Sequence, residues 1–343
     1  MNRIVPVFYL VLILFFGCDN NISTKSSTND MVVDSIAIIT TMINNDSLNE
    51  DLFAKRAEIF LQRGNINQAL RDIQTALDIN SEKAELFILL SDVYLVLGQT
   101  DNSILSLKKA IKLDPNNYIP LLKISEVYLL LEDPETAIRY ANKAISLDRY
   151  NAESYYIKAM GLMENADTNQ AITNLRISAN YDSTNYMTYM QLGAIYTARN
   201  DTNSKVYFTK ALNIYPSDER ALYYLGMYYH ENSQYDAALE KYSKVVELYP
   251  QNNRAYYNMG YIYLVEYEDY DNAKIMFEKA VDLSPSYVEA VYNLGRTMEV
   301  MGNYSGAREY YWKALELLPN YPLAVQSLNR LDDIQIRNNQ DTY

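Results

Sequence analysis

Residues 219–252 read ERALYYLGMYYHENSQYDAALEKYSKVVELYPQN, and this stretch decides the fold. Its first half carries Leu225, Gly226 and Tyr229, and its second half carries Ala238 and Tyr242. Both halves mix apolar and polar residues as amphipathic helices do, and the polar residues between them suit a short turn. The stretch therefore predicts two helices of about a dozen residues each, joined by a turn.

The same unit recurs along the chain at a nearly constant period. Four prolines follow one another at 34, 35 and 34 residues: Pro216, Pro250, Pro285 and Pro319. Three alanines in similar helices stand 34 residues apart: Ala76, Ala110 and Ala144. In register, eight units are 50–83, 84–117, 118–151, 152–185, 186–218, 219–252, 253–287 and 288–321. Because no single helix pair can bury its apolar face alone, stacking of neighbours is expected to stabilise the chain.

The order of aromatic, Leu-Gly, Tyr, Ala, aromatic and Pro resembles the tetratricopeptide repeat. The resemblance covers 50–321, and the copy at 253–287 carries it as Met259-Gly260, Tyr263, Ala273, Phe277 and Pro285. It implies an all-α solenoid, a right-handed superhelix of about eight helix-turn-helix repeats. In that family the first helices line the concave side and bind a partner protein or peptide.

Glycine and other small residues have two expected roles in these units. Gly64, Gly98 and Gly302 stand where first helices end, which predicts left-handed caps. Small residues such as Gly226 and Gly260 predict close approach of the two helices in a pair. The units at 152–185 and 186–218 depart from the pattern, and we expect looser packing there but no domain boundary.

Both ends of the repeats are expected to carry caps. Residues 322–336 place Leu323, Leu328, Leu331 and Ile334 roughly on one face, which predicts a capping helix followed by a polar tail to residue 343. Residues 31–49 are predicted to form the N-terminal capping helix and turn.

The first residues, MNRIVPVFYLVLILFFGC, predict a signal peptide over 1–17. Cys18, the only cysteine, follows Gly17 and an apolar run, and this resembles the lipobox of bacterial lipoproteins. The resemblance implies a lipid on Cys18 and a polar tether over 18–30. It favours a cell-envelope location, with the outer membrane favoured over the inner. The inner membrane stays an alternative, because Asp19 directly after the cysteine resembles an inner-membrane retention signal of some bacteria. The alternatives are a secreted protein with a chance cysteine, or an uncleaved anchor.

Composition excludes several classes of function. The net charge of −13 disfavours nucleic acid as a partner. One cysteine and one histidine, His230, leave no ligand set for a zinc site and no Ser-His-Asp triad. Ser106 and Lys109 match a Ser-x-x-Lys pattern, but without companion motifs. We therefore predict a protein that is not an enzyme and has no cofactor or metal.

The predicted partner-binding surface is the stripe of first-helix residues that the packing pattern leaves free. Its second half is aromatic and flanked by Arg and Asn, types that suit binding sites. The predicted partner-binding residues are Tyr156, Arg220, Tyr223, His230, Arg254, Tyr257, Asn258, Tyr261, Tyr292 and Asn293. Its first half carries a possible acidic ladder of Glu58, Asp92 and Glu126. The alternative for the tyrosines is packing between units.

These features together predict a scaffold or adaptor lipoprotein that holds a protein or peptide. A glycan- or nutrient-capture lipoprotein, using tyrosines to stack on sugars, is the alternative. Asn258 and Asn293 resemble part of the carboxylate clamp of chaperone-binding relatives, but the accompanying Lys-Asn arrangement is missing, so that function is not inferred.

Overall fold

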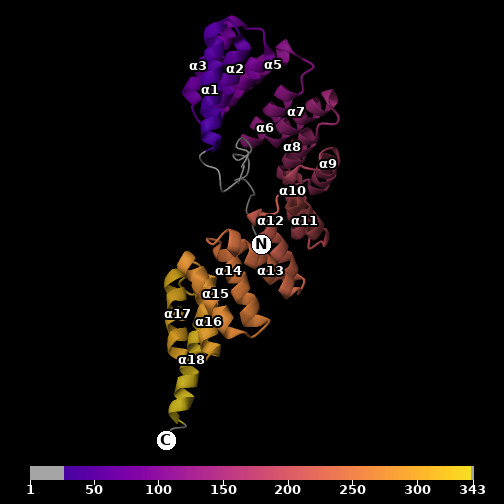
Figure 1. Cartoon of the computed structure of the whole chain (residues 1–343). Coiled ribbons are helices and arrows are strands. Elements are labelled where there is room, and N and C mark those ends of the chain that lie inside the picture. The colour runs from indigo at the N-terminus through magenta and orange to yellow at the C-terminus, as the bar shows by residue number, and fades with distance from the viewer. Residues whose placement is uncertain (1–26, 341–343) are drawn as a thin grey trace. The chain divides into compact units, whose positions relative to one another are not determined.

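The computed structural model describes the backbone of residues 27–340 and the side chains of residues 35–336. The predicted signal peptide, Cys18 and the tether up to residue 26 lie outside the described residues. All regular structure between residues 27 and 340 is helical, in helices α1 to α18 (Figure 1). The predicted all-α fold is confirmed.

The chain divides into two compact units, Met1–Ser183 and Thr184–Tyr343. The described part of the first unit holds α1 (Ser27–Asn45), α2 (Glu50–Gln62), α3 (Ile66–Ile79), α4 (Ala84–Val96), α5 (Thr100–Leu113), α6 (Ile119–Leu130), α7 (Pro134–Leu147), α8 (Ala152–Glu164) and α9 (Thr168–Tyr181). The second holds α10 (Tyr186–Ala198), α11 (Asn203–Ile214), α12 (Glu219–Glu231), α13 (Tyr235–Leu248), α14 (Asn253–Val265), α15 (Tyr270–Leu283), α16 (Val288–Val300), α17 (Tyr304–Leu317) and α18 (Pro322–Gln340).

Helices α2 to α17 form eight pairs, one in each predicted unit, which confirms a solenoid of about eight repeats. The N-terminal helix α1 begins at Ser27, inside the predicted tether, and α18 continues the predicted cap to Gln340. The division after Ser183 falls near the junction of repeats 152–185 and 186–218, whose sequences depart from the pattern. Looser packing but no boundary was expected there. Repeat 152–185 replaces the usual Ala by Ser178, and repeat 186–218 has a shortened turn.

Every turn within a pair contains one residue with a left-handed backbone. Its φ lies between 52° and 79° at Gly64, Gly98, Glu132, Ala166, Asn200, Ser233, Glu268 and Gly302. In the first turn the N–H of the next residue, Asn65, donates to the carbonyl of Phe60 at 2.8 Å, which closes the helix end. The predicted caps at the three glycines are confirmed. Five turns adopt the same conformation without glycine, because the helices on either side fix the path of the chain.

The predicted close approach within pairs is also present. A Cβ added to Gly226 would lie 2.7 Å from the Tyr242 ring, and one added to Gly260 would lie 2.9 Å from the Phe277 ring. Tyr242 and Phe277 are fully buried, so neither ring has free space to move into.

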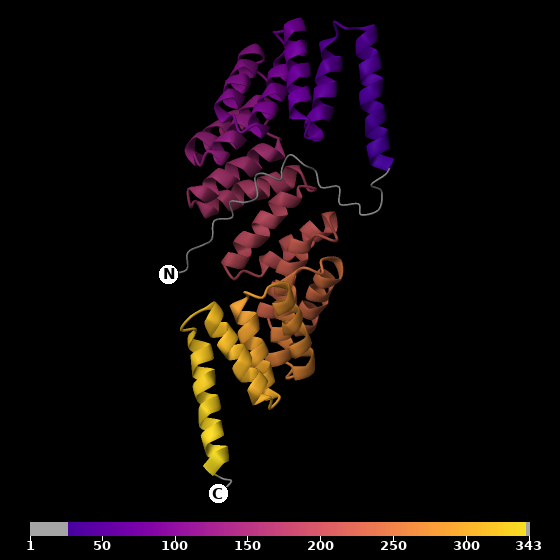
Figure 2. The same ribbon diagram turned by 90° about the vertical axis from the view of Figure 1, so that its left-hand side faces the viewer.

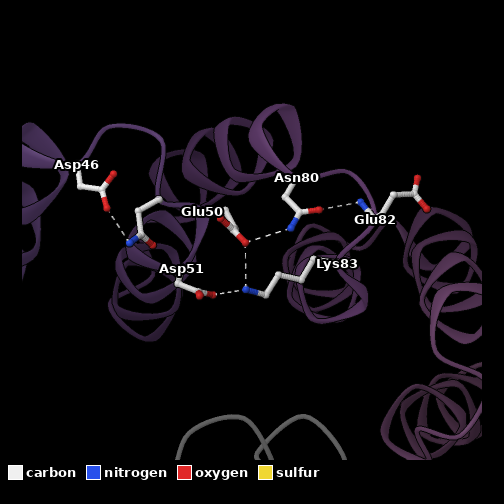
Figure 3. Close-up of polar contacts among 7 residues, drawn as sticks. Asp46, Glu50, Asp51, Asn80, Glu82 and Lys83 are labelled. Carbon is white, nitrogen blue, oxygen red and sulfur yellow. Dashed lines mark hydrogen bonds and ion pairs between the residues drawn. The ribbon is translucent and has the colours of Figure 1, made fainter.

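Polar contacts join neighbouring repeats at the start of their first helices. Lys83, before α4, pairs with Glu50 at 3.3 Å and with Asp51, and Asn80 donates to Glu50 at 3.1 Å (Figure 3). The second unit repeats part of this arrangement, where the Asn252 amide donates to Glu219 at 2.7 Å. These contacts fix the register of one pair against the next.

Candidate functional site

Four carboxylates lie on the first helices α2, α4, α6 and α8 of the first unit. We call this set the acidic face: Glu58, Asp92, Glu126 and Glu153. The side chains lie close enough to affect one another, since Asp92 acts on both Glu58 and Glu126. The predicted acidic ladder is thus brought together on one surface.

The acidic face is under-compensated by positive charge. An ion pair joins the Lys123 ammonium to Asp92 at 2.8 Å, and the charge of Lys55 acts on Glu58. Burial raises the pKa of Glu126 to about 7, and the charges of Glu153 and Asp92 add to that rise while Lys123 opposes it. Burial likewise raises the pKa of Asp92 and that of Glu58. The face is therefore a place where an added cation would relieve electrostatic strain.

Sequence reasoning missed Glu153 and Lys123. The predicted stripe sampled positions i, i+4 and i+7 of each first helix, and both residues lie outside those positions. Glu153 stands in the first turn of α8, where acidic residues are favoured by the helix dipole. From sequence alone, this local effect accounts for Glu153. Its electrostatic effect on Glu126 arises only because α6 and α8 stack.

Tyrosines on the first helices of the second unit form a hydrogen-bonded series, which we call the tyrosine face: Tyr223, Tyr257, Tyr292, Asn258, Asn293 and Ser327. The Asn258 amide donates to the Tyr223 hydroxyl at 3.2 Å, and the Asn293 amide donates to the Tyr257 hydroxyl at 3.2 Å. The Tyr292 and Ser327 hydroxyls lie 3.5 Å apart. Each tyrosine is thereby joined to the next helix pair or to α18.

The rings of the tyrosine face also pack inside the unit. The ring centroid of Tyr223 lies 5.8 Å from that of Tyr242, and Tyr257 lies 5.8 Å from Phe277. All three rings are half-buried, and burial raises the pKa of Tyr257 to about 12. These tyrosines therefore contribute to repeat packing.

The remaining predicted site residues differ in accessibility. Tyr261 and His230 are half-buried neighbours with ring centroids 5.7 Å apart, and burial lowers the pKa of His230. Arg254 is exposed, whereas Arg220 lies over the Tyr186 ring at 6.0 Å. Tyr156 is only 6% exposed, so its ring belongs to the core of the first unit rather than to an accessible surface.

Three findings in the described part of the chain concern metal binding, the Ser-x-x-Lys pattern and membrane spanning. No group of three or more His, Cys, Asp or Glu residues there is arranged to hold a metal ion. The Ser106 hydroxyl is buried and donates to the Asn102 carbonyl at 2.9 Å, while Lys109 lies 3.8 Å from Glu82. Over the same residues no helix combines the length and the apolar character needed to cross a membrane.

Family comparisons match both units. Models described as tetratricopeptide repeats match residues 84–117, 120–151, 207–240 and 264–331. A further model described as a TPR repeat matches 226–265. No curated protein matches the chain.

Among solved structures, a TPR repeat-containing protein supports this fold. The C-terminal part of a TPR repeat-containing protein from Cytophaga hutchinsonii is 18% identical, with a TM-score of 0.60, over 70% of this chain and 98% of that chain. MamA is 27% identical over 48% of this chain and 96% of that chain, with a TM-score of 0.43. A chain of the APC/C hetero-tetramer Cut9-Hcn1 is 17% identical over 89% of this chain and 60% of that chain, with a TM-score of 0.49.

Proposed function

The chain is a tetratricopeptide-repeat protein, and on this premise we propose that it is a non-catalytic adaptor lipoprotein of the bacterial cell envelope. Proteins of this family commonly bind protein partners. The observation that carries the proposal is the acidic face, which places Glu58, Asp92, Glu126 and Glu153 on successive first helices with Lys123 as the cation paired to them.

The acidic face suits an extended partner segment that carries Lys or Arg. Carboxylates at the repeat spacing can each meet one basic side chain, and each contact lowers the repulsion between neighbours. The leucines and methionines around them, such as Leu95 and Met160, offer partly buried apolar surface for the rest of the segment. Charge complementarity of this kind favours fast association that weakens as salt rises.

The anchor part of the proposal rests on the sequence. Cys18 is the only cysteine, and it follows Gly17 at the end of an apolar run too short to span a bilayer. A diacylglycerol on this thiol would hold the repeats at a membrane surface, with the outer membrane favoured. Metabolic fatty-acid labelling of wild type, lost in Cys18→Ser, is the expected result.

The partner site is tested by co-purification from membranes. The double variant Glu58→Gln/Glu126→Gln removes two carboxyl groups of the acidic face without breaking the Lys123 to Asp92 ion pair. We expect partner recovery to fall about tenfold, with a folded chain. The matched control changes two exposed carboxylates of the same unit, Glu85→Gln/Glu135→Gln. Equal recovery by both double variants would remove the acidic face from the proposal.

A second candidate function, glycan capture, is favoured by one observation. Helices α17 and α18 enclose an open groove of about 630 Å³, lined by Tyr304, Trp312, Arg308 and Ile334 among others. The Trp312 side chain is 54% exposed there, and exposed aromatic rings stack on sugars. Sugar binding that is lost in Trp312→Ala while partner recovery persists would support this second function.

A further inference from the structure

One side of helix α1 is left without a partner within the first unit. Helix α1 is the outermost helix of that unit (Figure 2), and its inner side packs Ile39 and Ile43 against α2. Its other side exposes four neighbouring residues, which we call the free face of α1: Ala37, Ile38, Thr41 and Met42. Ile38 is 55% exposed and Met42 is 48% exposed.

The free face carries no charge. Between Asp34 and Asp46 the sequence is SIAIITTMINN, without a charged residue. The Thr41 hydroxyl donates to the Ala37 carbonyl at 3.0 Å, so its hydrogen-bonding capacity is partly used within the helix. A helix that caps a repeat stack in water normally has a polar outer side.

The last helix of the chain shows what a polar cap looks like in the same protein. Helix α18 exposes Asn329, Asp332 and Asp333 among its apolar residues. Over its described side chains at 35–45, helix α1 exposes no charged residue, and its exposed asparagines, Asn44 and Asn45, lie at its C-terminal end. The free face therefore differs from α18 in having no exposed charge.

The position of the predicted anchor points to the occupant, and here the inference rests on the proposed function. Eight residues, 19–26, separate Cys18 from the start of α1. Nine residue steps span at most about 32 Å, so the start of α1 lies within about 32 Å of the lipid headgroups. The helix from Ser27 to Met42 is about 22 Å long, so Met42 reaches the membrane surface when α1 lies along it.

We propose that the free face of α1 lies on the lipid surface beside the anchor. Ile38 and Met42 enter the boundary between headgroups and acyl chains, and Thr41 lies at the level of the headgroups. A weak apolar contact suffices, because the anchor keeps the helix at high local concentration near the bilayer. The contact uses no basic residue, so it is insensitive to salt. It fixes which side of the first unit faces the membrane.

The test uses an internal pair of methionines. Met42 and Met301 are 48% and 41% exposed, so hydrogen peroxide should oxidise both at similar rates in water. The full-length protein is extracted from membranes and reconstituted into phosphatidylethanolamine and phosphatidylglycerol vesicles. Peptide mass spectrometry then follows sulfoxide formation at each methionine. We expect Met42 to react about fivefold or more slowly than Met301 on vesicles.

A charge on the free face supplies the matched variant. In Ile38→Glu the anchor is intact, and we expect vesicle association to persist while the Met42 rate returns to within about twofold of the Met301 rate. The intact mass of each sample reports the lipid. A chain without added lipid mass overturns the anchor and the lipid contact with it. A lipid-bearing, vesicle-bound chain with equal Met42 and Met301 rates overturns the contact alone. Protection of Met42 that disappears on dilution among vesicles would assign the face to a second copy of the chain.

Discussion

The two units solve the same packing problem with opposite choices of side-chain size. At the small position of each first helix the second unit has glycine, at Gly193, Gly226, Gly260 and Gly295. The first unit has alanine or serine at the positions in register with them, at Ala57, Ser91, Ser125 and Ala159. Across from these positions the second helices carry Phe208, Tyr242, Phe277 and Tyr311 in the second unit, and Ile73, Leu107, Ala141 and Leu175 in the first.

In seven of the eight pairs a small residue on the first helix faces a larger one on the second, so volume is balanced within the pair; Ser125 and Ala141 are the exception. A large ring on the second helix is matched by a missing Cβ on the first, with distances of 2.5 to 3.0 Å from the added Cβ to the ring at the four glycines. Rings bring hydroxyls into the core, and these must be satisfied. Tyr311 donates to Glu299 at 2.5 Å, whereas the buried Tyr242 hydroxyl has no hydrogen-bond partner among the described residues.

The largest predicted effect comes from breaking this match in the second unit. Gly226→Ala places a methyl group against the Tyr242 ring, and overpacking of this kind costs about 1–3 kcal/mol. The gain of about 1 kcal/mol in helix propensity offsets part of it. We expect a net loss of up to about 2 kcal/mol in the free energy of unfolding, measured by urea denaturation.

A double variant sharpens the same comparison. Gly226→Ala/Tyr242→Leu converts the pair to the alanine and leucine of Ala159 and Leu175 in the first unit. We expect it to recover most of the stability lost in the single variant, because the volumes match again. Volume matching would be contradicted if the double variant lost more free energy of unfolding than the two single variants lose together.

The two units also differ in the pKa of a carboxylate: that of Glu126 in the first unit is raised, and that of Glu299 in the second is lowered. A change of pH therefore alters their contributions to stability in opposite directions. Glu126 has a raised pKa of about 7, so its stabilising contribution is present below the ordinary value of 4.5 and is lost as pH rises to about 7. Glutamine does not titrate, so Glu126→Gln should not lose this stability as pH rises. We therefore expect the free energy of unfolding of the variant, relative to wild type, to be about 1–2 kcal/mol higher at pH 8 than at pH 4.5, after allowance for solvent screening. Thermal unfolding at the two pH values measures this.

Glu299 is the control in the second unit. Burial raises its pKa, but the hydrogen bonds from Arg330 at 2.7 and 2.8 Å and from Tyr311 outweigh burial and leave the pKa lowered. Its contribution is present above 4.5 and lost as pH falls through the lowered pKa. Glu299→Gln should thus destabilise the chain at pH 8, and progressively less in acid. If both variants became more stable relative to wild type as pH rises, or both less stable, the contrast between the two carboxylates would be refuted.

The smallest predicted effect concerns the turns, where the units do not differ. Ala166→Gly in the first unit and Ser233→Gly in the second each relieve a left-handed backbone in a residue with a Cβ. We expect each to stabilise the chain by about 0.5–1 kcal/mol in urea denaturation. The reverse change, Gly98→Ala, should cost a similar amount. A gain in only one unit would show that the turns, too, differ between the units.

The repeat register could be predicted from sequence because single residues, such as Pro250 and Gly226, recur at a nearly fixed spacing that marks the same position in successive repeats. The caps at Gly64, Gly98 and Gly302 were predictable for the same reason. The left-handed turns at Glu132 and Ala166 were not, since those residue types do not favour that conformation and only the packed helices impose it.

The candidate site was predictable in part. Glu58, Asp92 and Glu126 follow one another at 34 residues, so a periodic stripe finds them. The bond from Asn293 to Tyr257 spans 36 residues, and no periodic stripe on one helix reveals that two of its members bind each other across repeats. Solvent accessibility was the least predictable property, as the buried ring of Tyr156 shows.

The distribution of glycine among the eight turns has a consequence for how the chain opens. Glycine occupies the turn of the first, second and eighth repeats, while the turns of the third to seventh repeats hold residues with a Cβ. Stacking on neighbouring repeats can hold a disfavoured turn, and the first and eighth repeats each have a repeat on one side only. The end repeats should open most often, and glycine there keeps each closing step free of backbone strain. Amide hydrogen exchange would then be fastest in α2 and α17 yet fully reversible.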